Sequence, residues 1–206
     1  MALAERTVNP LERSLRQASS DLAELGHRFA VVGGLAVSTW AEPRLTRDAD
    51  LAVAVANDTE AESLVAALGD RGYSLIAAVE QTATGRLGTV RLVRREDGDG
   101  VVVDLLFAST GVEHEIVDGA VLTAVIPGLV LPVASVGHLI AMKLLARDDR
   151  HRPTDADDLT SLALAATDHD WEIARGAASL IEQRGYGRGR DLIGALSALR
   201  TATSRN

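Results

Sequence analysis

The chain has 206 residues, 47% of them hydrophobic and 24% charged, a composition that excludes an intrinsically disordered chain and favours one compact folded unit. Its net charge of −8 disfavours charge-driven coating of nucleic acid, although a local basic groove remains compatible with it. Cysteine is absent, which excludes a disulfide framework and thiolate metal sites.

The amino-terminal part of the chain predicts alternating helices and strands. Apolar residues at helical spacing predict a first helix over 11–25. A strand over 28–32 then ends at Gly33-Gly34, ahead of a helix over 35–41. Further strands are predicted over 48–55, 73–79, 89–95 and 101–108. A helix capped by Asn57 or Thr59 follows the strand 48–55. The turn EDGDG joins the last two strands as a hairpin.

The carboxyl-terminal part changes to helical spacing from Ser135 onward. Prolines and glycines interrupt the longest apolar run, 121–142, so no membrane span is expected. Glu5 and Arg6 stand where a secretory signal needs apolar residues, so the sequence predicts a cytoplasmic protein. We expect an α+β fold, a mixed sheet with helices followed by a helical bundle. The predicted helices are 136–146, 158–166, 171–181 and 192–199, and a connection over 128–134 divides domains 1–130 and 131–206.

Three aspartates on predicted strands stand out. Asp48 and Asp50 are two residues apart, so their side chains point to one face of the strand while Ala49 and Leu51 face the core. Asp104 lies in the apolar strand VVVDLL, where a carboxylate is costly unless it is paired, hydrogen-bonded or bound to a cation. If the two strands are neighbours, the acids converge, and Mg²⁺ would neutralise their repulsion.

Each aspartate also has a purely structural interpretation. Asp48 and Asp50 fit the solvated, capping end of an edge strand, and Asp104 fits a buried acid bonded to backbone or to an arginine. The occurrence of all three together favours the metal site.

Gly33 and Gly34 lie where a predicted strand passes into a helix. Bare backbone N–H groups at such a turn can approach a triphosphate closely, and Ser38 offers a hydroxyl. A simple tight turn is the alternative. The later glycine-rich run RGYGRGR is interpreted as a turn between helices, and the five histidines show no metal-ligand spacing.

The segment GGLAVSTWAEPRLTRDAD, with a third aspartate on a later strand, resembles the motif of the DNA polymerase β-like nucleotidyltransferase superfamily. Arg44, Thr46, Asp48 and Asp50 reproduce an R-x-[ST]-x-D-x-D signature that is similar to AbiEii-type and MenT-type toxins of bacterial toxin-antitoxin systems. Gly-Gly in place of the usual Gly-Ser favours that toxin branch. The resemblance spans about residues 28–160, and its later segment is carried by Lys143, Arg152, Asp155 and Asp158-Leu159.

The resemblance implies that an NMP moves from an NTP to an acceptor hydroxyl with two Mg²⁺ ions. Asp48 and Asp50 would hold both ions, and Asp104 the ion that activates the hydroxyl. Family analogy places Lys143 against the phosphates and Asp155 near the cleft. An ordinary surface lysine and an acid at the start of a helix are the alternatives for these two. The nucleotide-binding candidates are Gly33, Gly34, Ser38, Arg47 and Lys143.

The toxin resemblance also implies partners. An RNA acceptor is expected, the 3′ end of tRNA, together with a cognate antitoxin and, by analogy with some relatives, a kinase that modifies Thr46. Two alternatives stay open. One is an antibiotic adenylyltransferase, which needs acids around its acceptor pocket, and the other is a catalytically silent member that binds a partner. The candidate pocket acids are Glu113, Glu115, Asp148 and Asp149.

Overall fold

The computed structural model describes residues 9–94, 100–147 and 154–204. Within them lies a single seven-stranded mixed sheet with strand order β3-β4-β5-β2-β1-β7-β6. The strands are β1 (Phe29–Val31), β2 (Ala49–Val53), β3 (Tyr73–Glu80), β4 (Leu87–Arg94), β5 (Val102–Leu106), β6 (Val121–Ile126) and β7 (Leu129–Val133). The helices are α1 (Pro10–Glu24), α2 (Gly33–Trp40), α3 (Asp58–Asp70), α4 (Glu113–Asp118), α5 (Val136–Ala146), α6 (Thr154–Ala165), α7 (Asp168–Gln183) and α8 (Leu192–Thr203).

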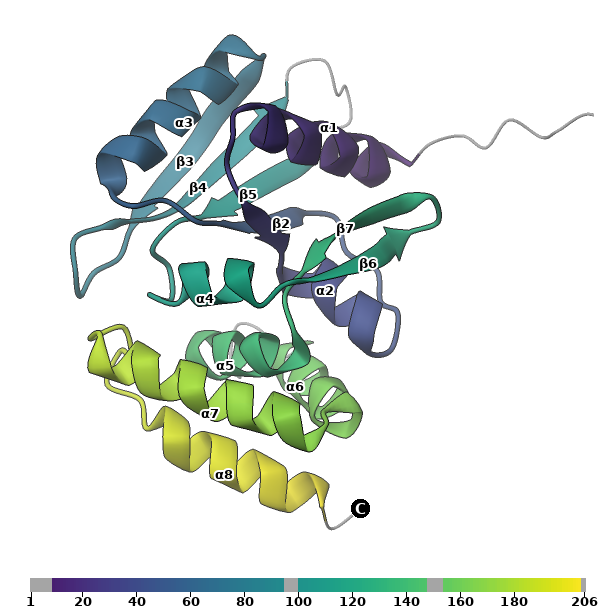
Figure 1. The fold of residues 1–206 in the computed structure, drawn as a ribbon, viewed down its shortest axis with the longest axis vertical. Helices are drawn as coiled ribbons and strands as arrows, with labels where there is room; N and C mark the ends of the chain where they lie inside the picture. The colour runs from purple at the N-terminus through teal and green to yellow at the C-terminus, as the bar shows by residue number, and fades with distance from the viewer. Residues whose placement is uncertain (1–8, 95–99, 148–153, 205–206) are drawn as a thin grey trace, which may run out of the picture.

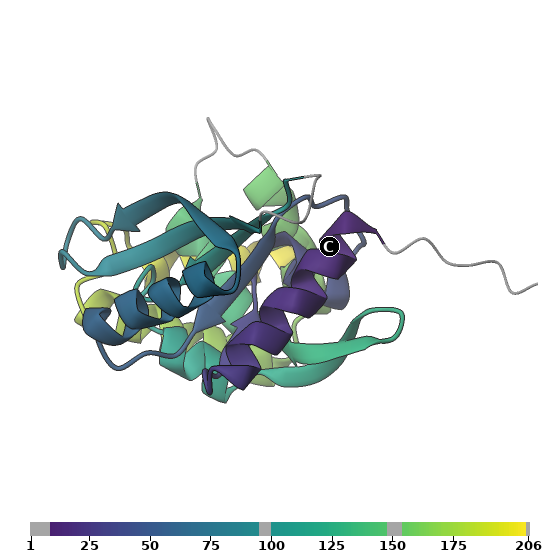
Figure 2. The ribbon, with the colours of Figure 1, turned by 90° about the horizontal axis from the view of Figure 1, so that it is seen from above.

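The elements form layers on the two sides of the sheet. Helices α1 and α3 lie on one side, and α5 to α8 form a helical layer on the other, with α2 and α4 between that layer and the sheet (Figure 1). Figure 2 shows the same arrangement from above, with α1 and α3 lying over the strands. The predicted α+β class, with a mixed sheet followed by a helical bundle, is confirmed.

The local signals in the sequence explain where the first elements begin. Asn9 accepts a hydrogen bond from the backbone of Leu11 at the start of α1, and Asn57 does the same for Glu60 in α3, as expected of asparagine at a helix N-cap. Leu15 and Leu22, one apolar stripe of α1, are almost completely buried. These caps and stripes place α1 and α3 against the sheet.

One face of the central strands is fully apolar. Ala49 and Leu51 of β2 are completely buried, and so are Val103 and Leu105 of β5, to within 2%. Because side chains alternate along a strand, the residues between them point to the opposite face. That opposite face carries Asp50 of β2 and Asp104 of β5.

The predicted connection over 128–134 is wrong. Residues Leu129–Val133 form β7, which lies between β1 and β6 in the sheet. Leu129, Leu131 and Val133 are buried while Val130 is exposed, so the run alternates as a strand should. The segment is the second strand of a hairpin with β6, and Gly128 lies at positive φ in the turn between the two strands.

The helical layer follows directly after the sheet. Helix α5 packs against α6 and α7, and Thr167 and Asp170 form a capping box at the start of α7. The sheet ends at Val133, and the division into two domains stays a prediction. No described helix is both long enough and apolar enough to span a membrane.

Candidate functional site

The strands that carry the aspartates are neighbours. Strand β2 pairs in parallel with β5, and the Cα of Asp50 lies directly opposite the Cα of Asp104. Asp48 is the second residue before Asp50, just ahead of the strand, and both are partly exposed, whereas Asp104 is buried. Asp50 and Asp104 are therefore register partners on neighbouring strands, which is the condition that the sequence analysis set for the acids to converge.

Gly33 lies tightly against Asp50. A Cβ at residue 33 would lie 1.9 Å from Asp50 Oδ2 and 2.8 Å from Asp50 Cβ. Gly33 also has φ +64°, a left-handed backbone conformation that side chains disfavour. Only glycine satisfies both conditions, so the start of α2 and the Asp50 carboxylate are in contact.

Asp104 is held by an arginine that the sequence reasoning missed. Arg91 on β4 lies opposite Asp104, and its Nε and Nη2 donate to Asp104 Oδ1 at 2.9 Å and Oδ2 at 2.7 Å. The hydrogen bond and charge of Asp104, followed by the charges of Asp48 and Asp50, raise the pKa of Arg91. The arginine-bonded interpretation of Asp104 thus describes this structure.

The carboxylates are not gathered around one point. Among the described residues, no three histidine, aspartate or glutamate side chains are placed together closely enough to hold a metal ion. The ligand chemistry itself suits Mg²⁺, since all three groups supply hard oxygen atoms. In the present arrangement both oxygens of Asp104 accept from the guanidinium of Arg91.

A second group of charges joins the start of α2 to the helical layer. A Cβ at Gly34 would lie 2.6 Å from Arg44 Nη2, so the Arg44 guanidinium lies against the first turn of α2. Arg44 in turn donates from Nη2 to Asp158 Oδ2 at 2.9 Å. Asp158 on α6 is almost completely buried, and it anchors this contact from the helical side.

Lys143 belongs to the same group. Its Nζ lies 2.7 Å from Asp155 Oδ1 and 2.7 Å from Asp158 Oδ2, and its side chain is only 14% exposed. Asp155 is the second residue of α6, which begins at Thr154 as the alternative interpretation expected. In this structure Lys143 is therefore a partly buried ion-pair partner rather than a free surface lysine.

The other predicted residues lie in the α2–β2 segment. The Ser38 hydroxyl donates to the carbonyl of Gly34 at 3.0 Å and accepts from the backbone of Arg44 at 3.2 Å, so it fixes the loop that carries the signature. Thr46 Oγ1 lies 3.4 Å from the carbonyl oxygen of Asp48. Arg47 is exposed.

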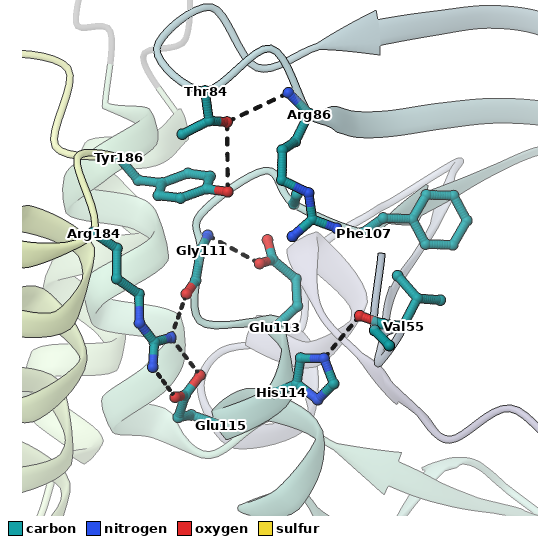
Figure 3. A pocket seen from close by; sticks show the side chains of 12 residues that line it. Val55, Thr84, Arg86, Phe107, Gly111, Glu113, His114, Glu115, Arg184 and Tyr186 are labelled. Carbon is teal, nitrogen blue, oxygen red and sulfur yellow. Dashed lines mark hydrogen bonds and ion pairs between the residues drawn. The ribbon is translucent and has the colours of Figure 1, made fainter. Parts of the chain in front are cut away.

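A cavity of about 520 Å³ opens where β2 and β5 end. Val55 and Phe107, which follow those strands, lie on its wall, together with Arg184 and Tyr186 from the turn after α7. Figure 3 shows the Tyr186 hydroxyl pointing to Thr84, at 3.5 Å. The glycine-rich run RGYGRGR is thus the predicted interhelical turn, and it also docks on the sheet half.

The cavity also contains two of the acids that an antibiotic acceptor pocket would need. Both carboxylate oxygens of Glu115 accept from Arg184, at 2.6 and 3.0 Å. Glu113 accepts from the backbone of Gly111 at 2.9 Å (Figure 3). It also accepts from the backbone and hydroxyl of Thr110, and burial raises its pKa. Both acids are engaged in internal contacts. Asp148, Asp149 and Arg152 lie outside the described residues.

The chain matches one protein-family model over most of its length. The family model described as "Nucleotidyl transferase AbiEii toxin, Type IV TA system" matches residues 17–205. No curated protein sequence matches the chain.

Two solved structures share the fold. An antigenic nucleotidyltransferase-like protein from Paracoccidioides brasiliensis is 18% identical with a TM-score of 0.53, covering 92% of this chain and 93% of that one. The antibiotic-resistance factor ANT(2'')-Ia is 19% identical with a TM-score of 0.51, covering 91% and 95%. The architecture is that of a polymerase β-like nucleotidyltransferase. Since the family model matches nearly the whole length, the chain belongs to the AbiEii nucleotidyltransferase toxin family.

Proposed function

We propose that this nucleotidyltransferase moves an NMP from an NTP to the 3′ end of tRNA, with Mg²⁺ held by Asp48, Asp50 and Asp104, and that it blocks translation as the toxin of a toxin-antitoxin pair. The observation that carries the proposal is the register of β2 and β5, which sets Asp50 directly opposite Asp104. When bound, two Mg²⁺ ions would supply charge neutralisation at the attacking and leaving oxygens.

The start of α2 is the proposed triphosphate site. Gly33 touches Asp50, and the Val32 N-cap provides no side-chain hydrogen bond to the first turn, where backbone N–H groups point along the helix axis. Arg44 lies over Gly34 and supplies positive charge there. We propose that Lys143 and Asp155 orient Arg44 indirectly. Lys143 pairs with both Asp155 and Asp158, and Asp158 in turn holds Arg44.

The cavity at the ends of β2 and β5 is the proposed place for the acceptor. Phe107 is three residues beyond Asp104, which corresponds to about 10 Å along an extended strand. A terminal nucleotide reaching from the cavity to the acids would need roughly that span. Arg184 and Tyr186 on the cavity wall offer a cation and an aromatic ring, both suited to RNA.

Control of the activity is proposed at Thr46. A phosphate there would add about −1.5 to −2 charges, next to the backbone of Asp48. It would repel the triphosphate of the NTP and compete with Asp48 for the metal ions, so a kinase would silence the toxin. Stoichiometric phosphorylation should abolish NTP binding measured by calorimetry, and an unchanged titration would reject this mode of control. The family's antitoxin is the other expected partner.

The acceptor can be identified directly. We would incubate the protein with each NTP and Mg²⁺, either with total tRNA or with an aminoglycoside, and weigh the acceptor by mass spectrometry. A gain of one or more nucleotides on tRNA is expected. Modification of the aminoglycoside alone would favour the antibiotic adenylyltransferase, and no gain on either acceptor would favour a catalytically silent member.

The acids are tested in the same assay. Asp48→Asn, Asp50→Asn and Asp104→Asn should each abolish transfer, because an amide is a poor ligand for a hard cation. Asp70→Asn, at the exposed end of α3, is the matched control and should retain full activity. Transfer by any of the three variants at the wild-type rate would refute its assigned role.

A further inference from the structure

The side chain of Arg91 occupies the acidic site. Its two donors contact both oxygens of Asp104, at 2.9 and 2.7 Å, in the fork geometry that makes arginine–carboxylate pairs strong. The contact follows from the sheet, because Arg91 and Asp104 are opposite each other on antiparallel strands. While this pair persists, a metal ion at Asp104 would have to share both oxygens with the positively charged guanidinium.

Arg91 lies on the strand next to the acids. Strand β4 pairs with β5 and β5 pairs with β2, so Arg91, Asp104 and Asp50 stand on three adjacent strands. Since Asp50 lies opposite Asp104 on the other side, β5 is flanked by an acid on β2 and a base on β4. One positive charge thus balances part of a group of three negative charges.

The two partners differ in their freedom to move. The Arg91 side chain is 47% exposed, whereas that of Asp104 is 10% exposed. Arginine also has a long stem that can turn toward solvent, while an aspartate on a central strand has little room. If the pair opens, Arg91 is the partner that leaves.

We propose that Arg91 competes with divalent metal for Asp104, and that it is displaced when metal and nucleotide bind together. The proposal rests on the metal-dependent function proposed above. A metal ion that binds without nucleotide has to break the charge-assisted pair between Arg91 and Asp104, and the Arg91 guanidinium then loses its carboxylate partner. A bound triphosphate gives the guanidinium a new anionic partner, because its fork matches phosphate oxygens as well. Metal and nucleotide should therefore bind cooperatively, through Arg91.

The test measures metal binding rather than turnover. Mn²⁺ would be titrated, with free ion followed by electron paramagnetic resonance, with and without a non-hydrolysable NTP analogue. Arg91→Met removes the charge and keeps the length, and Arg91→Lys keeps the charge without the fork. Arg175→Met, at an exposed position of α7, is the control for net charge.

Without nucleotide, Arg91→Met should bind Mn²⁺ about tenfold more tightly than wild type, a factor within the usual range for coupled sites. The gain in Mn²⁺ affinity on adding nucleotide should shrink by a similar factor. Arg91→Lys should lie between the two, and Arg175→Met should match wild type. Thermal melting checks the fold, and Arg91→Gln replaces the methionine variant if that one does not fold.

Equal or weaker Mn²⁺ binding by Arg91→Met, alongside clear binding by wild type, would overturn the proposal and leave the proposed function standing. If no protein binds Mn²⁺, even with nucleotide present, the metal-dependent function fails and the competition fails with it.

Discussion

Replacing Gly33 with alanine should damage both stability and chemistry. The φ of +64° costs a side-chain-bearing residue about 1–2 kcal/mol. The new Cβ would also lie 1.9 Å from Asp50 Oδ2 and 2.8 Å from Asp50 Cβ. Because the Asp50 Cβ is fixed to the strand, rotating the carboxylate away cannot relieve the second overlap. Overpacking of this kind adds about 1–3 kcal/mol.

Gly85 offers a matched control for this substitution. It has φ +67°, and a Cβ there would meet nothing within 4 Å, so Gly85→Ala carries the backbone cost alone. Urea unfolding should show a loss of about 1–2 kcal/mol for Gly85→Ala and about 2–5 kcal/mol for Gly33→Ala. Only Gly33→Ala should lose nucleotidyl transfer. Equal losses of stability in the two variants, with transfer retained in both, would refute the contact between Gly33 and Asp50.

Three further predictions test other parts of the structure. Asp158→Asn should cost about 3–5 kcal/mol in urea unfolding, since it leaves Arg44 without its carboxylate and Lys143 with Asp155 alone. Asp157→Asn, at an exposed position, should be neutral, and similar effects of the two variants would contradict the ion-pair group. Burial lowers the pKa of His138 from its ordinary value of 6.5, so on acidification His138 is protonated in the unfolded chain before it is protonated in the folded one. The free energy of unfolding should therefore fall as pH drops below about 6.5. His138→Gln should make this dependence on pH less steep, and an unchanged dependence would contradict the burial of a neutral His138. Gly111→Ala would place a Cβ 2.4 Å from the ring of Tyr186, so trypsin should cut the turn after α7 faster, and cleavage at the wild-type rate would show that the turn is not docked there.

The alternation of apolar residues predicted correctly which face of β2 is buried. Ala49 and Leu51 are in the core, which turns Asp50 to the other face, and the strand containing Asp104 is the neighbour of β2. These features follow from the two-residue period of a strand, which is visible in sequence. The assigned chemical roles of the three acids remain predictions.

The partner of Asp104 depends on a detail that the sequence leaves ambiguous. Strands β4 and β5 were predicted to flank a hairpin turn, but pairing the residues next to that turn would set Arg91 opposite Leu105. The observed register pairs Val93 with Val102, which moves Arg91 opposite Asp104. A slip of one residue reverses the face of every side chain, so the register of β4 and β5 decides whether the arginine meets the acid.

Long-range ion pairs were also beyond the sequence. Arg44 was recognised within the signature, but its contact with Asp158 joins residues 114 positions apart. The pairing of Lys143 with Asp155 and Asp158 depends on how α5 packs against α6. No local pattern fixes that packing, because several helix pairings would bury the same apolar stripes equally well.

The central claim is that carboxylates from β2 and β5 share divalent metal during transfer. Anomalous diffraction from a crystal soaked with Mn²⁺ and a non-hydrolysable NTP analogue tests it most directly. The account predicts a Mn²⁺ peak coordinated by Asp48, Asp50 and Asp104, with Arg91 turned from Asp104 to the phosphates. A nucleotide-bound crystal in which Arg91 still grips Asp104 and Mn²⁺ lies elsewhere would contradict the account.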